Sequence, residues 1–168
     1  MVQVIDTHAH LDEIADLNEA IERAKAAGVA AVVAMGVDYA ANNRVLEIAA
    51  RHAGFVFPAL GMHPQNIGDP AEVERNLRFI ADHTAEAVAV GEIGLDYHQR
   101  TLAMASKNVQ KGVLRDVLGI ARRAGKPVSI HSRYAWQDAV EAVMADGIER
   151  AVFHWFTGPL NVLRKAFA

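Results

Sequence analysis

The sequence predicts an α/β fold, a TIM-type (β/α) barrel, and two features of the chain support this prediction. Short, almost entirely apolar runs alternate with longer amphipathic stretches, a pattern typical of parallel strands joined by crossover helices. Histidine or acidic residues follow the ends of five of these runs. An open sheet gathers its ligand-binding residues mainly at one crevice, whereas a barrel gathers them from many strand ends. The distribution therefore favours a barrel over a doubly wound sheet.

Six apolar runs are predicted to be strands, because each has the near-continuous hydrophobicity of a strand buried on both faces. They comprise residues 2–5, 30–37, 55–60, 87–93, 128–131 and 151–156. Helices are predicted between them where apolar residues recur every three or four positions, around Leu17, Val45, Val113 and Trp136. The expected helix stops are Gly28, Gly54, Gly125 and Gly147.

Composition narrows the function classes. A chain of 168 residues predicts one domain, residues 1–168, and 52% hydrophobic residues supply a packed core. The net charge of −3 argues against a basic surface that binds nucleic acid non-specifically. It does not argue against a site that binds one phosphate through a metal ion. The absence of cysteine excludes disulfides, thiolate zinc sites and a cysteine nucleophile. Without a signal peptide or a long apolar run, we expect a cytoplasmic protein that makes no membrane contact.

The end of the sequence falls inside an unfinished pattern. A complete barrel needs roughly 250 residues, and the helical spacing of Leu160, Leu163 and Phe167 meets no stop signal. We therefore expect this single barrel domain to lack its last two βα units. The alternative is a genuine six-unit protein, whose first and sixth strands would be exposed edges that a partner chain should cover.

The first chemistry-bearing motif is Asp6-Thr7-His8-Ala9-His10. Side chains alternate faces along a strand, so His8 and His10 should point to the same side and can bind one metal ion. The alternative is a pair of hydrogen-bonded core histidines.

A second motif, Gly91-Glu92-Ile93-Gly94, ends the fourth predicted strand. Because side chains alternate between the two faces of a strand, Glu92 should lie at the end of a row of inward-facing apolar residues. Burying a carboxylate there costs free energy unless a cation compensates its charge. A structural salt bridge to Arg133 is the alternative, but the flanking glycines indicate close approach to something bound.

The fifth and sixth strands each end in an imidazole, at His131 and His154. Together with His8, His10 and Glu92 they form a nitrogen and oxygen donor set too large for one tetrahedral ion. Two ions bridged by Glu92 would use them all. His63, after the third strand, is a sixth ligand, a substrate contact or a structural residue, and we favour the substrate contact. The guanidinium of Arg133 can bind a phosphate through two parallel hydrogen bonds.

These motifs, in this order, resemble the TatD-type metal-dependent deoxyribonucleases of the amidohydrolase superfamily. The resemblance covers the whole chain, and GEIGLDY is its most specific motif. The matching segments are DTHAHL at 6–11, GMHP at 61–64, GEIGLDY at 91–97, Gln110, PVSIHSR at 127–133 and FHWFTG at 153–158.

The resemblance implies that His8 and His10 bind one metal, that His131 and His154 bind the second, and that Glu92 bridges them. It places His63 and Arg133 near a substrate phosphate. It also implies a DNA substrate, single-stranded or at a 3′ end, and an aspartate after an eighth strand that this sequence does not contain. Asp96 matches a family position without a definite role.

We therefore predict a hydrolase of DNA phosphodiester bonds that activates water with two divalent ions, zinc, manganese or magnesium. No protein partner is implied unless a chain covers the sheet edges. One alternative is a hydrolase of the same superfamily that cuts an amide or an aminoacyl ester. The other is a non-catalytic metal-binding module, if the eighth-strand aspartate is truly absent from the natural chain.

Overall fold

Six parallel strands form one sheet whose order follows the chain, β1-β2-β3-β4-β5-β6. The coordinates are a computed structural model that describes residues 3–166. The strands are β1 (Val4–Ala9), β2 (Val29–Met35), β3 (Val56–Met62), β4 (Ala89–Asp96), β5 (Val128–Arg133) and β6 (Ala151–Phe153). The order never reverses, as it would at the switch point of a doubly wound sheet. The sheet is therefore six strands of a TIM-type barrel, as predicted.

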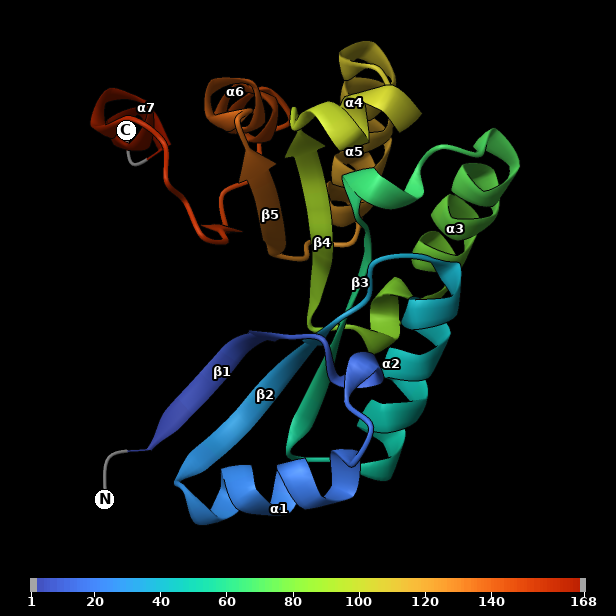
Figure 1. Cartoon of the computed structure of the whole chain (residues 1–168), viewed down its shortest axis with the longest axis vertical. Helices are drawn as coiled ribbons and strands as arrows, with labels where there is room; N and C mark the ends of the chain where they lie inside the picture. The colour runs from blue at the N-terminus through green and yellow to red at the C-terminus, as the bar shows by residue number, and fades with distance from the viewer. Residues whose placement is uncertain (1–2, 167–168) are drawn as a thin grey trace.

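Helices connect the strands and lie on the outer side of the curled sheet (Figure 1). They are α1 (Leu17–Ala26), α2 (Tyr39–Arg51), α3 (Pro70–His83), α4 (Gln99–Met104), α5 (Lys107–Arg123), α6 (Trp136–Ala145) and α7 (Leu160–Ala166), with short 3-10 turns η1 (Leu11–Glu13), η2 (Pro64–Asn66) and η3 (Thr84–Glu86). Asp38, Asp69 and Ser106 accept hydrogen bonds from the backbone N–H groups that open α2, α3 and α5. Among the described residues, no helix combines the length and the apolar character needed to cross a membrane.

The core lies between the sheet and these helices, in two clusters. The larger surrounds β3, β4, β5 and α5, with Leu60, Leu95 and Leu114 among its buried members. The smaller joins β2 to α1 and α2 around Val32 and Val45. The ends of β3, β4 and β5, which carry three of the predicted site residues or lead into them, are therefore attached to a packed layer.

The strands β2, β3, β4 and β5 differ from the predicted ranges by one to three residues at one or both ends. The two outer strands differ as well. The first predicted strand, 2–5, begins at Val2, which lies outside the described residues, and β1 continues to Ala9. The prediction relied on apolar side chains and therefore stopped at the polar residues after Ile5. The strand continues because its backbone pairs with β2, which does not require apolar side chains. The sixth strand was predicted to reach 156 but ends at Phe153. It is followed by a turn in which Trp155 takes a φ of 46°, outside the extended region.

The two outer strands carry exposed apolar side chains. Val4 and Ile5 on β1 and Val152 on β6 are all exposed, although each is of the type found in buried strands. This matches the expectation that six strands leave the first and sixth as edges. Phe167, which marked the last helical repeat in the sequence, lies outside the described residues.

Candidate metal centre

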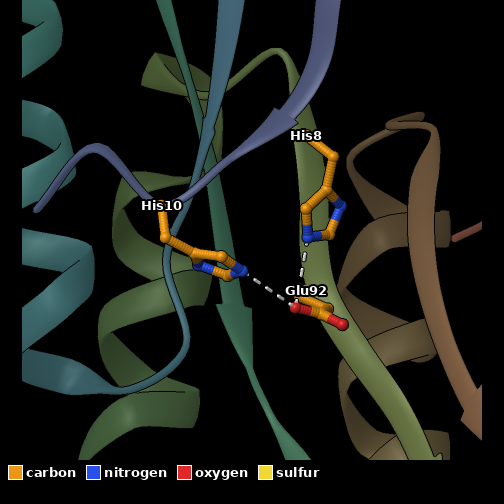
Figure 2. Close-up of side chains that lie close together, drawn as sticks. All are labelled: His8, His10 and Glu92. Atoms are coloured by element: carbon orange, nitrogen blue, oxygen red, sulfur yellow. Dashed lines mark ion pairs between the residues drawn. The ribbon is translucent and has the colours of Figure 1, made fainter. Parts of the chain in front are cut away.

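Glu92 on β4 lies at the centre of a ring of imidazoles. Its side chain is only 5% exposed. Carboxylate atom Oε2 lies 3.3 Å from His8 Nε2 and 3.5 Å from His10 Nε2. Oε1 lies 2.9 Å from His131 Nδ1 and 3.8 Å from His63 Nε2. Figure 2 shows the rings of His8 and His10 reaching Glu92 from β1 and the segment after it. Four segments far apart in sequence thus meet at one carboxylate.

The backbone around Glu92 is packed too closely for side chains on its neighbours. The Glu92 N–H donates a hydrogen bond to the carbonyl of Gly36 at 3.1 Å. A Cβ on Gly61 would collide with the Glu92 nitrogen, and one on Gly91 would press on Ser129. Glycine at both positions therefore lets β3 and β5 approach Glu92, which explains the glycine before the acid in the motif.

The donor atoms fall into two groups that share Glu92. His8, His10 and Glu92 form the first, and His63, Glu92 and His131 form the second, with donor atoms within 4.8 Å of one another in each. His154 belongs to neither group. Its ring stacks on that of His8, with centroids 3.6 Å apart and planes 7° apart. The structure thus brings five predicted site residues together: His8, His10, His63, Glu92 and His131. The ring of His154 lies against that of His8, outside both groups.

Several buried nitrogens in this ring lack a hydrogen-bond partner among the described residues. They are His8 Nε2, His10 Nδ1 and His131 Nε2. His131 Nδ1 lies 2.9 Å from Glu92 Oε1, and its Nε2 lies 3.5 Å from Asp96 Oδ2. Buried imidazole nitrogens without a partner, beside the buried carboxylate of Glu92, are donor atoms that a cation can use. Imidazole and carboxylate donors of this kind fit a divalent transition metal.

His63 differs from the other histidines of the ring. Its Nδ1 accepts a hydrogen bond from the Gln65 backbone N–H at 3.2 Å. In the neutral ring, Nε2 therefore carries the hydrogen and faces Glu92 as a donor. Burial, with the repulsion of His131, lowers the pKa of His63 to about 4. The ring is thus neutral at physiological pH and presents an N–H, which suits a contact to a substrate oxygen better than a metal bond.

Charge in the site is concentrated on Glu92. Burial alone would raise the pKa of Glu92, but its contacts with His10, His131 and His8 outweigh burial and hold that pKa well below its usual range. Contact with Glu92 raises the pKa of His10, against the opposing effect of burial. Burial and the nearby His8 lower the pKa of His154. Glu92 is therefore a permanent anion among rings that can give up their protons to a metal.

Arg133 binds Asp96 instead of Glu92. Its Nε and Nη2 donate to both carboxylate oxygens of Asp96, at distances from 2.6 to 3.1 Å. Asp96 is fully buried, and Thr101 also donates to it. Burial would raise the pKa of Asp96, but Arg133 and the other donors lower it. The sequence did not predict that Asp96 pairs with Arg133. Its position in the GEIGLDY motif was the only signal that singled it out.

A polar cavity of about 420 Å³ opens beside the ring and is lined by His10, His63, Glu92, Arg44, Gln65 and Asn66, among others. A larger cavity, of about 520 Å³, lies between α1 and α2 and contains none of the histidines. The smaller cavity is therefore the one relevant to chemistry at Glu92.

Comparison with known proteins agrees with this geometry. The profile of the family described as "TatD related DNase" matches residues 5–168. The chain belongs to this family.

Among its TatD relatives, the chain is 36% identical to the uncharacterized metal-dependent hydrolase YabD of Bacillus subtilis, covering 96% of this chain and 64% of YabD. It is 32% identical to the human deoxyribonuclease TATDN3, covering 96% of this chain and 63% of TATDN3. The crystal structure of YJJV, a TatD homologue from Escherichia coli, superimposes with a TM-score of 0.83 and 27% identity over 97% of this chain and 64% of YJJV. The chain thus spans just under two thirds of the length of these relatives.

Proposed function

We propose that the protein is a metal-dependent hydrolase that cleaves phosphodiester bonds of DNA with two divalent ions. The observation that carries the proposal is the buried carboxylate of Glu92, shared by two groups of imidazole donors with unpartnered buried nitrogens. Two relatives support the substrate: TATDN3 is named a deoxyribonuclease, and a 31% identical protein of Yersinia pseudotuberculosis is named a 3'-5' ssDNA/RNA exonuclease. We also propose that residues 1–168 belong to a single metallohydrolase barrel domain, of which they supply six βα units.

In this proposal each site residue has one role, either binding an ion or binding the substrate phosphate. His8, His10 and Glu92 hold one ion, and His131 with Glu92 holds the other, with His154 as its further ligand. When bound, the ions lower the pKa of coordinated water and stabilise charge on the phosphoryl oxygens. His63 donates its Nε2 hydrogen to a phosphoryl oxygen. Arg133, still 41% exposed beyond its contact with Asp96, orients the substrate phosphate.

The decisive experiment replaces Glu92 by glutamine, which keeps the size of the side chain and removes its charge. The Glu92→Gln variant should hold one ion or none and lose hydrolysis of single-stranded DNA, because both groups lose their shared anion. Bound ions are counted by elemental analysis of the purified protein. The matched control is Glu86→Gln, an exposed carboxylate paired with His83, which should keep metal and activity. Full metal content and activity in Glu92→Gln would refute the proposal.

The same preparation separates the proposed nuclease from its alternatives. Wild-type protein is assayed on single-stranded DNA, on a dihydropyrimidine and on an aminoacyl ester. Cleavage of DNA alone supports the proposal, and cleavage of either other substrate alone identifies an amide or ester hydrolase. Metal binding without cleavage of any substrate identifies a non-catalytic module.

A further inference from the structure

Two large aromatic side chains stand in solvent near the candidate metal centre. Tyr134 is 60% exposed and Trp155 is 87% exposed, whereas tryptophan is normally largely buried. Each directly follows a proposed site residue, since Tyr134 comes after Arg133 and Trp155 after His154. Exposed rings just beyond the ends of the neighbouring strands β5 and β6 call for an explanation.

The backbone at both residues is strained. Tyr134 has a φ of 56° and Trp155 a φ of 46°, and they are the only non-glycine residues with positive φ among residues 3–166. Bulky side chains are disfavoured in this region, which glycine adopts without cost. Strain of this kind gathers at binding and catalytic sites, where the position of a side chain matters more than local stability.

The rings continue the stacking that begins inside the site. His154 stacks on His8 at 3.6 Å, and Trp155 lies nearly parallel to His154, with centroids 5.9 Å apart and planes 14° apart. A series of three near-parallel rings therefore leads from the first donor group to solvent. Just after β5, Tyr134 lies nearly parallel to His98, with planes 21° apart and centroids 6.3 Å apart.

We propose that Tyr134 and Trp155 are stacking platforms for the unpaired bases of a single strand whose phosphodiester bond lies at the metal centre. Each base presents a flat π face to such a ring, so the contact tolerates any sequence. Bases in a duplex are already stacked on their neighbours and cannot use these rings without being unpaired. This inference rests on the proposed function, and it assigns to two named residues the preference for unpaired bases.

Fluorescence tests the contact directly, because Trp136 and Trp155 are the only tryptophans of the chain. The probe is a phosphorothioate-linked single-stranded oligothymidylate, which resists cleavage during the titration. It should quench the emission of the metal-loaded wild type and of Trp136→Phe strongly and that of Trp155→Phe much less, since the ring of Trp136 lies beside Tyr134, with centroids 6.0 Å apart. A strand of equal length with abasic sites should quench none of them.

Affinity and kinetics extend the test to Tyr134. Tyr134→Ala and Trp155→Ala should each weaken binding of a labelled oligothymidylate about tenfold, measured by fluorescence anisotropy. Each should raise the KM for single-stranded DNA more than it changes kcat. Tyr134→Phe and Trp155→Phe should restore affinity, because they keep the flat ring. Leu160→Ala, at another exposed apolar side chain, is the matched control and should bind as the wild type does.

Three outcomes overturn the inference. They are wild-type affinity in both alanine variants, equal binding of the abasic strand, and a Trp155 shielded from acrylamide in the free protein, which would show that another protein surface covers it. If the wild type neither cleaves nor binds DNA, the proposed function itself has failed. If it cleaves DNA while both alanine variants keep its KM, only this inference has failed.

Discussion

Two buried carboxylates on β4 are neutralised in different ways. Asp96 is held by a fixed cation of the protein, Arg133, through both carboxylate oxygens. Among residues 3–166, the side chain of Glu92, four residues earlier, meets only imidazoles. A guanidinium stays charged at any physiological pH, whereas an imidazole readily gives up its proton. The protein thus neutralises Asp96 permanently and leaves Glu92 available for an exchangeable cation.

The Asp96–Arg133 pair predicts a pH-dependent loss of stability in Arg133→Gln. The pKa of Asp96 lies below its usual 3.8 in the folded protein, so the pair stabilises at neutral pH, and this contribution is lost as pH falls through the folded pKa. Allowing for the exposure of Arg133, the variant should lose about 1–3 kcal/mol at pH 7. Its deficit should shrink below about pH 4, as Asp96 becomes protonated in the variant.

Urea denaturation at a series of pH values measures this difference. Arg78→Gln, which removes an exposed ion pair with Glu74, should stay within about 0.5 kcal/mol of wild type. A deficit in Arg133→Gln that stays constant or grows on acidification would contradict the role given to the pair.

At the scale of elements, side-chain amides from helices replace missing backbone contacts at strand ends. Asn42 on α2 accepts from the Gly61 N–H at 2.9 Å and donates to the Gly61 carbonyl at 2.9 Å. Asn76 on α3 donates to the same carbonyl at 3.1 Å. Gln110 on α5 likewise bonds the backbone N–H and carbonyl of Asp96. The β3–β4 register shifts between Leu60 and Met62, so these amides fix β3 where the ladder with β4 is irregular.

Asn42→Ala should therefore weaken metal binding beyond its effect on stability. It leaves buried polar groups of Gly61 and Asn76 unpaired, at a cost of about 2–4 kcal/mol. Because Gly61 packs against the Glu92 backbone, metal affinity measured by calorimetric titration should fall as well. Val45→Ala, on the same helix and fully buried, loses stability by forming a cavity and should keep the wild-type affinity. Equal metal affinities in the two variants would show that Asn42 is only structural.

Two helices, α3 and α4, were not predicted from the sequence, and for α3 a buried amide is part of the reason. The six strands were predicted from apolar runs alone, with errors of a few residues at their ends. α3 was not predicted individually: Val73, Leu77 and Ile80 recur at helical spacing and pack in the larger core cluster, but the buried Asn76 interrupts this apolar face. α4 has only six residues, too few to show a helical period. Periodicity detects helices that pack through apolar side chains, and α3 packs partly through an amide.

The candidate site was predictable where it depended on position along a strand. Residues at the ends of parallel neighbouring strands must lie near one another, so the sequence predicts the meeting of His8, Glu92 and His131. It does not predict lateral contacts such as the stacking of His154 on His8 or the pairing of Arg133 with Asp96. Those contacts depend on side-chain rotation in three dimensions. The metal-binding roles themselves stay predictions until ions are counted.

At the scale of the whole molecule, metal binding should stabilise the fold. The proposed ligands His8, His10, Glu92 and His131 come from β1, the segment after it, β4 and β5, and no such site exists in an unfolded chain. A free ion concentration a hundredfold above Kd should add about 2.7 kcal/mol, seen as a higher Tm. Chelation should reverse the gain. An unchanged Tm on adding zinc and manganese, or an equal rise in Glu92→Gln, would contradict this prediction.

The strictly sequential strand order bears on how the protein is made. Each strand pairs with the strand synthesised just before it, so a nascent chain can extend the sheet at one edge without waiting for later segments. The first donor group is complete once Glu92 has left the ribosome, and the second only after His131 has followed. Ion capture during translation would therefore proceed in two stages, with the earlier ion already fastening the amino-terminal half while the remainder is still being assembled.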